Sequence, residues 1–312
     1  MRARTAVEKA FVVVNPVAGS NAGQLDRALR KLLGAAGWAW EIYATTGEER
    51  LADVVRAAAD RTDDAIDLVI AAGGDGTVSG VAGGVARTGL PMGIVPLGTG
   101  NTLARELGIP LAMKPALELL TADHDVVELD AMAVDQRFFV LNVSVGISGL
   151  MMRDTSRADK RRFGRIAYVW TGLRKLFGYQ PHRFELAVDD GDRRFIRASE
   201  IAIVNSGALG DPSLRWSPQV ELDDGRIDVC VVRAKSLLDY LRLAVAVVLR
   251  RHEEEPGIRH YIAERRVVVD VESDLPVQAD GEFLGKPPVK VDVVPGAVRM
   301  VVPKDSDRRR AS

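Results

Sequence analysis

The sequence predicts an α/β domain built on a parallel sheet, followed by an antiparallel β-rich sandwich domain. Three observations support this fold class. Apolar runs alternate with amphipathic segments from about residue 9 to 130, three of these runs end in glycine-bearing loops, and short alternating runs separated by Asp-Gly turns follow. Strands that alternate with helices form parallel sheets covered on both faces, whereas short strands joined by tight turns form antiparallel sandwiches.

The elements of the first half can be placed in order. Apolar runs predict strands at 11–14, 40–43, 68–72 and 92–96. Amphipathic spacing predicts helices at 24–33, 48–59, 78–86, 102–107 and 115–120. Parallel sheets bind ligands at the carboxyl ends of their strands. Because each glycine-rich break falls at such an end, we expect the ligand site there.

The second half changes character. Alternating runs predict strands at 137–143, 183–188, 195–205, 227–233, 266–271, 277–279, 289–293 and 299–302, with helices at 166–176 and 236–251. No flexible linker marks the boundary near 125–130. We therefore expect a domain 1–130 and a domain 131–303 that pack around a cleft, with the last strand able to return to the first domain. The charged tail 304–312 is expected to fray.

Bulk properties exclude several classes of protein. The 312 residues suffice for two domains, and 47% hydrophobic with 27% charged residues is ordinary for a soluble protein. A net charge of −1 gives no global attraction to nucleic acid, so we expect no nucleic-acid partner. One cysteine excludes an internal disulfide.

Localisation follows from the apolar runs. The longest, 243–249, is far shorter than the ~18 residues that span a bilayer, and no signal peptide is recognisable at the N-terminus. We expect a cytoplasmic protein. Peripheral contact with the inner membrane face stays open because it needs no spanning segment, and so does a homodimer.

The third predicted strand ends in the most informative segment, Gly73, Gly74, Asp75, Gly76 and Thr77. A buried strand that ends in glycines and turns into a helix brings backbone N–H groups close to a phosphate. A carboxylate among these glycines repels a polyphosphate unless a divalent cation or a proton lies between them. The segment therefore indicates a phosphate site with metal or acid–base chemistry rather than a dinucleotide crevice.

Two further strand ends carry glycine. The first strand is followed by Asn15, Pro16, Val17, Ala18 and Gly19, which alone are more typical of an ordinary loop.

The fourth strand is followed by Gly98, Thr99, Gly100, Asn101 and Thr102. Asn101 or Thr99 can cap the next helix, whose N-terminus favours anions, although simple capping is the alternative. Three such loops at one sheet edge are more specific than any one of them, and they predict a phosphate or nucleotide site.

Acidic turns mark the second domain. Asp280 followed by Gly281 is typical of a hairpin turn, and Glu282 directly after it is either exposed to solvent or directed into a cleft. Asp223 and Asp224 precede another glycine, where a turn is the simpler interpretation and a hard-cation site the alternative.

Several other patterns carry less weight. The basic segment 160–165, with Arg174 and Lys175, is either a solvated helix face or a surface for anionic lipid. Cys230 lies in an apolar run and is expected in the core, and the histidines lack the spacing of a zinc site. Neither a P-loop nor a Gly-x-Ser-x-Gly elbow is present in the sequence.

Taken together, these motifs resemble the bacterial diacylglycerol kinase family, which also contains sphingoid-base and ceramide kinases. The resemblance covers nearly the whole chain and rests on the segments 15–19, 44–45, 73–77, 96–101, 142–146, 223–228 and 279–282. The 73–77 motif alone is shared with NAD kinases and phosphofructokinases, whereas the second-domain motifs favour lipid kinases. The family often has Asn-Asp where this chain has Asn101 and Thr102, which leaves the lipid subclass open.

The resemblance implies an N-terminal nucleotide-binding domain and a C-terminal β-rich domain with ATP between them. The implied nucleotide-binding residues come from the strand ends of the first domain. They are Asn15, Pro16, Val17, Ala18, Gly19, Thr45, Gly73, Gly74, Asp75, Gly76, Thr77, Gly98, Thr99 and Asn101.

The resemblance also implies the catalytic and metal residues. Glu282 corresponds to the catalytic base, with Asp75 and Asp130 as supporting carboxylates that organise Mg²⁺. A structural Mg²⁺ would use the side chain of Asp224 with backbone carbonyls near Glu221 and Arg226.

The predicted function is transfer of the γ-phosphate of ATP to a lipid hydroxyl at a membrane surface, with diacylglycerol as the first candidate. A sphingoid-base or ceramide kinase is one alternative. A kinase of a soluble substrate such as NAD, and a nucleotide or lipid sensor without turnover, are two others.

Overall fold

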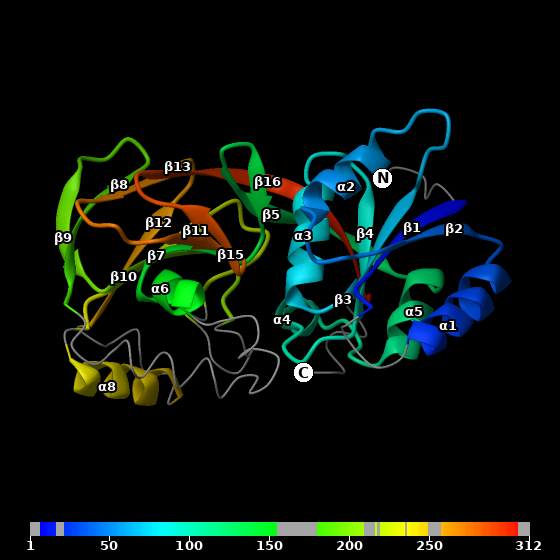
Figure 1. Ribbon diagram of the computed structural model, residues 1–312, viewed down its shortest axis with the longest axis horizontal. Coiled ribbons are helices and arrows are strands. Elements are labelled where there is room, and N and C mark those ends of the chain that lie inside the picture. Colours follow the sequence, from blue (N-terminus) through cyan, green and yellow to red (C-terminus); the bar gives the residue numbers. More distant parts are fainter. Residues whose placement is uncertain are drawn as a thin grey trace. The chain divides into compact units, whose positions relative to one another are not determined.

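The computed structural model describes residues 7–16, 22–154, 180–208, 216, 219–234, 236–248 and 257–304. The chain divides into two compact units. Unit 1 comprises the residues up to 129 and those from 296 onward, and unit 2 comprises residues 130–295. Each unit has its own apolar core, so each is described by itself, although the long strand β16 (Val289–Val302) pairs with strands of both (Figure 1).

Unit 1 is built on a parallel sheet with the strand order β2-β1-β3-β4-β16. Its first four strands are β1 (Lys9–Val14), β2 (Ala39–Ala44), β3 (Leu68–Gly73) and β4 (Pro91–Pro96). The C-terminal part of β16 (Val289–Val302) pairs in parallel with β4 through Arg299 and Met300. Because all these pairs are parallel, the strands end at the same edge of the sheet.

Helices cover both faces of this sheet, as the apolar runs predict (Figure 1). On one face, α1 (Ala22–Ala35) and α5 (Met113–Thr121) pack their leucines against alternate residues of β1 and β3. On the other face lie α2 (Leu51–Ala59) and α3 (Asp75–Val85). The short α4 (Thr102–Glu106) follows β4. Leu29 and Leu33 of α1 are fully buried. Removing these apolar side chains from water stabilises the packing of α1 on the sheet.

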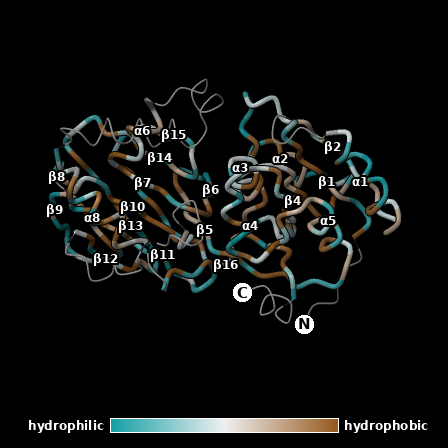
Figure 2. The backbone as a smooth tube through the Cα atoms, turned by 90° about the horizontal axis from the view of Figure 1, so that it is seen from below, coloured by the Kyte–Doolittle hydropathy of each residue, from teal (hydrophilic) through white to brown (hydrophobic). Residues whose placement is uncertain are grey.

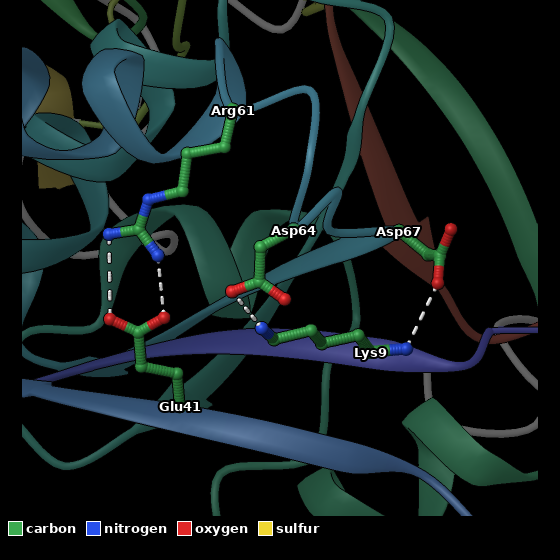
Figure 3. Close-up of polar contacts among 5 residues, drawn as sticks. All are labelled: Lys9, Glu41, Arg61, Asp64 and Asp67. Carbon is green, nitrogen blue, oxygen red and sulfur yellow. Dashed lines mark hydrogen bonds and ion pairs between the residues drawn. The ribbon is translucent and has the colours of Figure 1, made fainter.

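A polar cluster ties down the opposite, amino-terminal ends of the strands (Figure 3). The Asp67 carboxylate accepts the backbone N–H groups of Glu8 and Lys9, both at 2.9 Å. The Lys9 ammonium pairs with Asp64, and Arg61 donates to Glu41 of β2 at 2.6 Å. This cluster lies away from the glycine-bearing ends, so its role is structural.

Unit 2 is a sandwich of two largely antiparallel sheets, as predicted. One sheet has the order β12-β11-β10-β7-β14-β15, and the other continues from β16 through β13 and β8 to β9. The strands of the first sheet are β7 (Asn142–Gly146), β10 (Glu200–Val204), β11 (Ile227–Val232), β12 (Ile258–Ala263), β14 (Val277–Ala279) and β15 (Glu282–Gly285). The second contains β8 (His182–Val188), β9 (Arg194–Ala198) and β13 (Arg266–Val271).

The core of unit 2 lies between these sheets. Val145 and Ile203 from the first sheet and Phe184, Val267 and Val291 from the second are all fully buried and belong to one cluster. The apolar colouring of these strands in Figure 2 follows this arrangement. Two helices, α6 (Ile147–Asp154) and α8 (Leu237–Val248), follow β7 and β11 in the chain.

Five element predictions are corrected. The predicted strand 137–143 is interrupted after residue 139, and its two parts belong to different sheets. A ten-residue strand, β5 (Asp125–Val134), runs through the predicted domain boundary, and the short β6 (Arg137–Phe139) pairs with it. Residues 289–302 form one strand rather than two, residues 194–204 form two strands in different sheets, and β12 was not predicted. The predicted helix at 166–176 and the basic segment lie outside the described residues.

Candidate functional site

The predicted nucleotide residues of unit 1 follow the carboxyl ends of neighbouring parallel strands. Asn15 and Pro16 come directly after β1, and the Asn15 N–H donates to Ala72 of β3. Thr45 follows β2, and its N–H donates to Val14. Val17, Ala18 and Gly19 lie outside the described residues. The described members of the set therefore share one edge of the sheet.

Glycines allow two of these loops to touch. A Cβ atom added to Gly98 would lie 2.5 Å from the Cα of Gly74, which is closer than real Cβ contacts. The N–H of Leu97 donates to the carbonyl of Gly73 at 2.9 Å. At Gly100 a Cβ would lie 2.3 Å from the Asp75 carboxylate. The loops after β3 and β4 therefore form a single backbone-lined unit that only glycine permits.

Asp75 holds this unit together. Its Oδ1 accepts the N–H of Thr102 at 2.6 Å, and its Oδ2 accepts the N–H of Asn101 at 3.0 Å. These are the first N–H groups of α4, so a carboxylate from α3 caps another helix. Each oxygen keeps a further lone pair.

The sequence predicted that Asn101 or Thr99 would cap α4, and this prediction is wrong because another residue provides the cap. Asn101 is left-handed, with φ of 52°, and makes no side-chain cap. Its amide instead exchanges two hydrogen bonds with the backbone of Gly98, at 3.0 and 2.8 Å. The cap comes from Asp75, 26 residues earlier in the chain.

Helix α3 begins three residues earlier than predicted. Asp75, Gly76 and Thr77 form its first turn, because the N–H groups of Thr77 and Val78 donate to the Gly74 carbonyl. Thr77 is buried, whereas a Cβ on Gly76 would meet open space. The first N–H groups of a helix have no partner within it, and together with the helix dipole they attract anions.

In unit 2, Glu282 begins β15 directly after the predicted hairpin turn. Asp280 and Gly281 both have positive φ, 46° and 89°, as a two-residue hairpin turn requires. The Glu282 side chain is 50% exposed and forms an ion pair with Arg137. The guanidinium of Arg137 also lies 5.1 Å from the centre of the Phe139 ring. Glu282 is thus an accessible carboxylate with one cationic neighbour.

Asp280 does more than form the turn. Its carboxylate accepts three backbone N–H groups, from Val140 at 2.9 Å, Leu141 at 3.0 Å and Asn142 at 2.8 Å. The turn bearing Glu282 is thereby fixed to the start of β7.

Asp130 lies against the acidic turn of unit 2. It is 2% exposed, and its Oδ2 accepts the N–H of Gly225 at 2.6 Å. Its own N–H donates to the carbonyl of Leu222. Asp130 and Glu282 belong to unit 2, whereas Asp75 belongs to unit 1.

The acidic turn itself gathers negative charge. Asp224 accepts the N–H of Arg226 at 3.0 Å, and Glu221 lies on the same turn. Burial, together with the nearby charge of Asp224, raises the pKa of Asp228 to about 6. A cation beside Asp224 would offset this repulsion, so the donor set suits a hard metal ion.

Two features are absent from the described residues. In the part of the chain that the structure describes, no three His, Cys, Asp or Glu side chains form a ready metal cluster. No helix among the described residues is long and apolar enough to cross a membrane.

Sequence reasoning missed Arg137 and the anchoring role of Asp280. Arg137 lies 145 residues before Glu282, and no spacing connects them. The anchoring role of Asp280 could have been predicted in part from its residue type, because the carboxylate of an Asp in a turn commonly accepts backbone N–H groups.

Comparisons with known proteins identify both halves of the chain. A model of the diacylglycerol kinase catalytic domain matches residues 9–134, and a model of the YegS C-terminal NAD kinase beta sandwich-like domain matches residues 142–302. A diacylglycerol kinase of Bacillus subtilis is 27% identical, covering 96% of this chain and 98% of its own. A Chromohalobacter salexigens protein named "Probable lipid kinase YegS-like" is 28% identical, and the match covers 81% of this chain and 82% of that protein.

A solved structure shares the fold over nearly the whole length. The crystal structure of a diacylglycerol kinase from Bacillus anthracis superposes with a TM-score of 0.75 and 25% identity. It covers 97% of this chain and 100% of its own.

Proposed function

Because the chain belongs to the bacterial diacylglycerol and lipid kinase family, we propose that it transfers the γ-phosphate of ATP to the hydroxyl of diacylglycerol, which gives phosphatidic acid. Membership supports a lipid kinase that uses ATP. The choice of diacylglycerol rests on the names of the relatives.

One observation carries the nucleotide part of the proposal. The loops after β3 and β4 touch at Gly74 and Gly98 and are locked by Asp75, beside the open N-terminus of α3. Backbone N–H groups that are already held in place bind phosphate without a further ordering cost, which is how positioning contributes to phosphoryl transfer.

Glu282 is the proposed base. As the lipid oxygen forms its bond to the γ-phosphorus, the bond from that phosphorus to the bridging oxygen breaks and ADP leaves. The hydroxyl proton passes to the Glu282 carboxylate, and general base catalysis of this kind is typically worth about 10²–10⁴ in rate. Arg137 lies beside this carboxylate and holds it in position.

Mg²⁺, when bound, would neutralise charge on the phosphate oxygens. Asp75 is the proposed carboxylate for it near the loops, through the lone pairs that its two backbone hydrogen bonds leave. Asp224, with carbonyls near Glu221 and Arg226, is the proposed set for a structural ion. Asp130 would support that second set, because it is hydrogen-bonded to the same turn.

The proposed partner is a membrane surface that presents the lipid. On α8 the side chains of Leu238, Leu241 and Val245 are 56%, 51% and 57% exposed. At 100° per residue they fall on one stripe together with the exposed Arg242. Apolar side chains with a cation among them suit an anionic bilayer surface.

A panel of acceptors tests the proposed function. Radiolabelled ATP is supplied with diacylglycerol, sphingosine, ceramide or monoacylglycerol in mixed micelles, with NAD, and with no acceptor. We expect label in phosphatidic acid. Label in NADP would instead establish the soluble-substrate alternative. ATP binding without ADP release in every arm would establish a sensor.

A further inference from the structure

The hairpin that bears Glu282 is held by a second side chain, Gln278, which neither the sequence motifs nor the proposed mechanism uses. Gln278 lies on β14 and is 6% exposed. Its Oε1 accepts the N–H of Gly281, the residue directly before Glu282, at 3.2 Å. Its Nε2 donates to Asn142 Oδ1 at 2.7 Å and to Ser144 Oγ at 2.6 Å.

These contacts fix the Gln278 amide in one orientation. An amide has two N–H donors and one carbonyl acceptor, and each kind is used. The Gly281 N–H can only donate, so a flipped amide would place its own N–H donors against that N–H and lose the bond. Ser144 lies directly opposite Gln278 in the β7–β14 register, so the bonds follow from strand pairing. The amide is therefore a rigid link between β7 and the turn.

The link continues to the start of α6. Ser144 Oγ lies 2.6 Å from Ser148 Oγ, and the N–H of Ser148 donates to the Glu200 carboxylate at 3.0 Å. α6 also packs closely against the segment directly before β14, because a Cβ on Gly149 would lie 2.5 Å from the Pro276 carbonyl oxygen. A row of side chains thus joins the turn to β7, α6 and β10.

We propose that Gln278 is a positioning residue for Glu282: its amide sets the place of the Asp280–Gly281 turn, and so of Glu282 directly after it, relative to β7, with Ser144 and Ser148 as its anchor. The inference rests on the proposed role of Glu282 as the base. Asp280 holds the first residue of the turn to the 140–142 backbone, whereas Gln278 holds the peptide between the two turn residues, Asp280 and Gly281, directly before Glu282. Displacing a base by a fraction of an ångström lowers turnover without changing nucleotide binding.

The first test is Gln278→Met, which keeps the length of the side chain but removes every hydrogen bond. We expect kcat to fall at least tenfold with an unchanged KM for ATP, because the glycine loops belong to unit 1. In a Glu282→Gln background the same substitution should cost no further activity, since there is then no base to place. An equal loss in both backgrounds would overturn the proposal.

The matched control is Ser199→Ala. Ser199 is fully buried in the same unit, and its hydroxyl donates to the Val232 carbonyl at 3.0 Å, away from the turn. This variant should lose thermal stability while its kcat stays within about twofold. If it lowers kcat as much as Gln278→Met does, general destabilisation explains both and the positioning role is wrong.

Hydrogen exchange gives a readout that needs no substrate. The Gly281 amide should exchange at least tenfold faster in Gln278→Met, and Ser144→Ala should give a smaller change in the same direction. If Gln278→Met does not fold, exchange of the Gly281 amide in Ser144→Ala provides the test instead. Unchanged exchange at Gly281 in the folded variant would overturn the inference.

The outcomes separate this inference from the proposed function. Absence of label in every lipid acceptor would remove the proposed function. Wild-type turnover in Glu282→Gln would leave lipid kinase activity standing but remove the base, and with it the positioning role. An inactive Glu282→Gln beside a fully active Gln278→Met would leave the proposed function standing and remove the positioning role alone.

Discussion

Asp75 is the residue whose role differs most from its sequence interpretation. It was predicted as a carboxylate that organises a metal among glycines. In the structure its two oxygens cap α4 and join the loops after β3 and β4. The two roles are compatible, because a carboxylate offers about four lone-pair sites and two are used.

The substitution Asp75→Asn tests the capping role. An asparagine accepts one of the two N–H groups but presents its own donors to the other, so the cap of α4 is lost. We expect the Asn101 and Thr102 amides to exchange at least tenfold faster, which corresponds to about 1.4 kcal/mol and lies within the range for bonds to a charged group. Asp53→Asn, on the exposed first turn of α2, is the control and should leave these amides unchanged. Equal protection in Asp75→Asn would show that the cap is not needed.

The pKa of Asp228 gives a prediction about pH. Burial and the charge of Asp224 raise this pKa from the ordinary value of 3.8 to about 6. The folded protein therefore binds more protons than the unfolded chain between about pH 4 and 6, and stability falls as pH rises through this window. Without divalent cations, Asp228→Asn should stabilise the protein at pH 7.5 by about 1 kcal/mol, a figure reduced for partial exposure to water.

Urea unfolding at pH 4, 5, 6 and 7.5 measures this effect, which should vanish at pH 4. The exposed Asp274, paired with Lys286, supplies the control: Asp274→Asn should change stability by less than about 0.5 kcal/mol at each pH. A stabilisation that is the same at pH 4 and 7.5 would show that charge is not its cause.

At the scale of elements, the close approach of two loops is the feature on which the proposed phosphate binding depends. Gly98→Ala would place a Cβ 2.5 Å from the Gly74 Cα, and neither backbone can move without disturbing the Asp75 cap. We expect ATP affinity to fall at least tenfold by calorimetry. Gly23→Ala in α1 is the matched control, because its Cβ meets nothing within 4 Å and alanine favours a helix. Unaltered ATP affinity in Gly98→Ala would contradict the placement of the phosphates.

Helix α8 gives a second prediction at this scale. Leu238→Ser with Leu241→Ser should reduce binding to vesicles that contain phosphatidylglycerol by at least tenfold, while activity on a soluble short-chain diacylglycerol stays the same. Leu111→Ser is the control, since Leu111 is an exposed leucine of unit 1. If both variants bind vesicles equally, α8 does not contact the membrane. If light scattering shows a wild-type dimer that the α8 variant loses, the stripe is instead an interface between two copies.

For the whole molecule, the sequence predicts most where side chains are buried on both faces. The strands β3 and β4 match their predicted ranges within a residue, because a parallel strand covered by helices is a continuous apolar run. The antiparallel half is less predictable. β5 alternates charged and apolar residues across the domain boundary, and β12 carries Arg259 and His260 within its run.

Two breaks show why local pattern is not enough. Pro295 and Gly296 are typical of a turn, yet β16 continues through them with Gly296 at φ of 58°. Conversely, the apolar run around Ser199 looks continuous, but β9 and β10 belong to different sheets. Whether a strand continues there depends on its partners across the sheet, which a single sequence does not contain.

The candidate site shows the same division. The loops that motifs could identify, after β3 and β4 and at 280–282, are located as predicted along the chain. The contacts that give them their shape join residues distant in sequence: Asp75 with Asn101, Glu282 with Arg137, and Asp280 with the 140–142 backbone.

The most direct test of the central claim is the turnover of Glu282→Gln. The substitution keeps the size of the side chain and removes its ability to take a proton. We predict that incorporation of radiolabel into phosphatidic acid falls by at least 10², while the dissociation constant for ATP stays within about twofold. Turnover equal to that of the wild type would contradict the assignment of Glu282 as the base and, with it, the proposed mechanism.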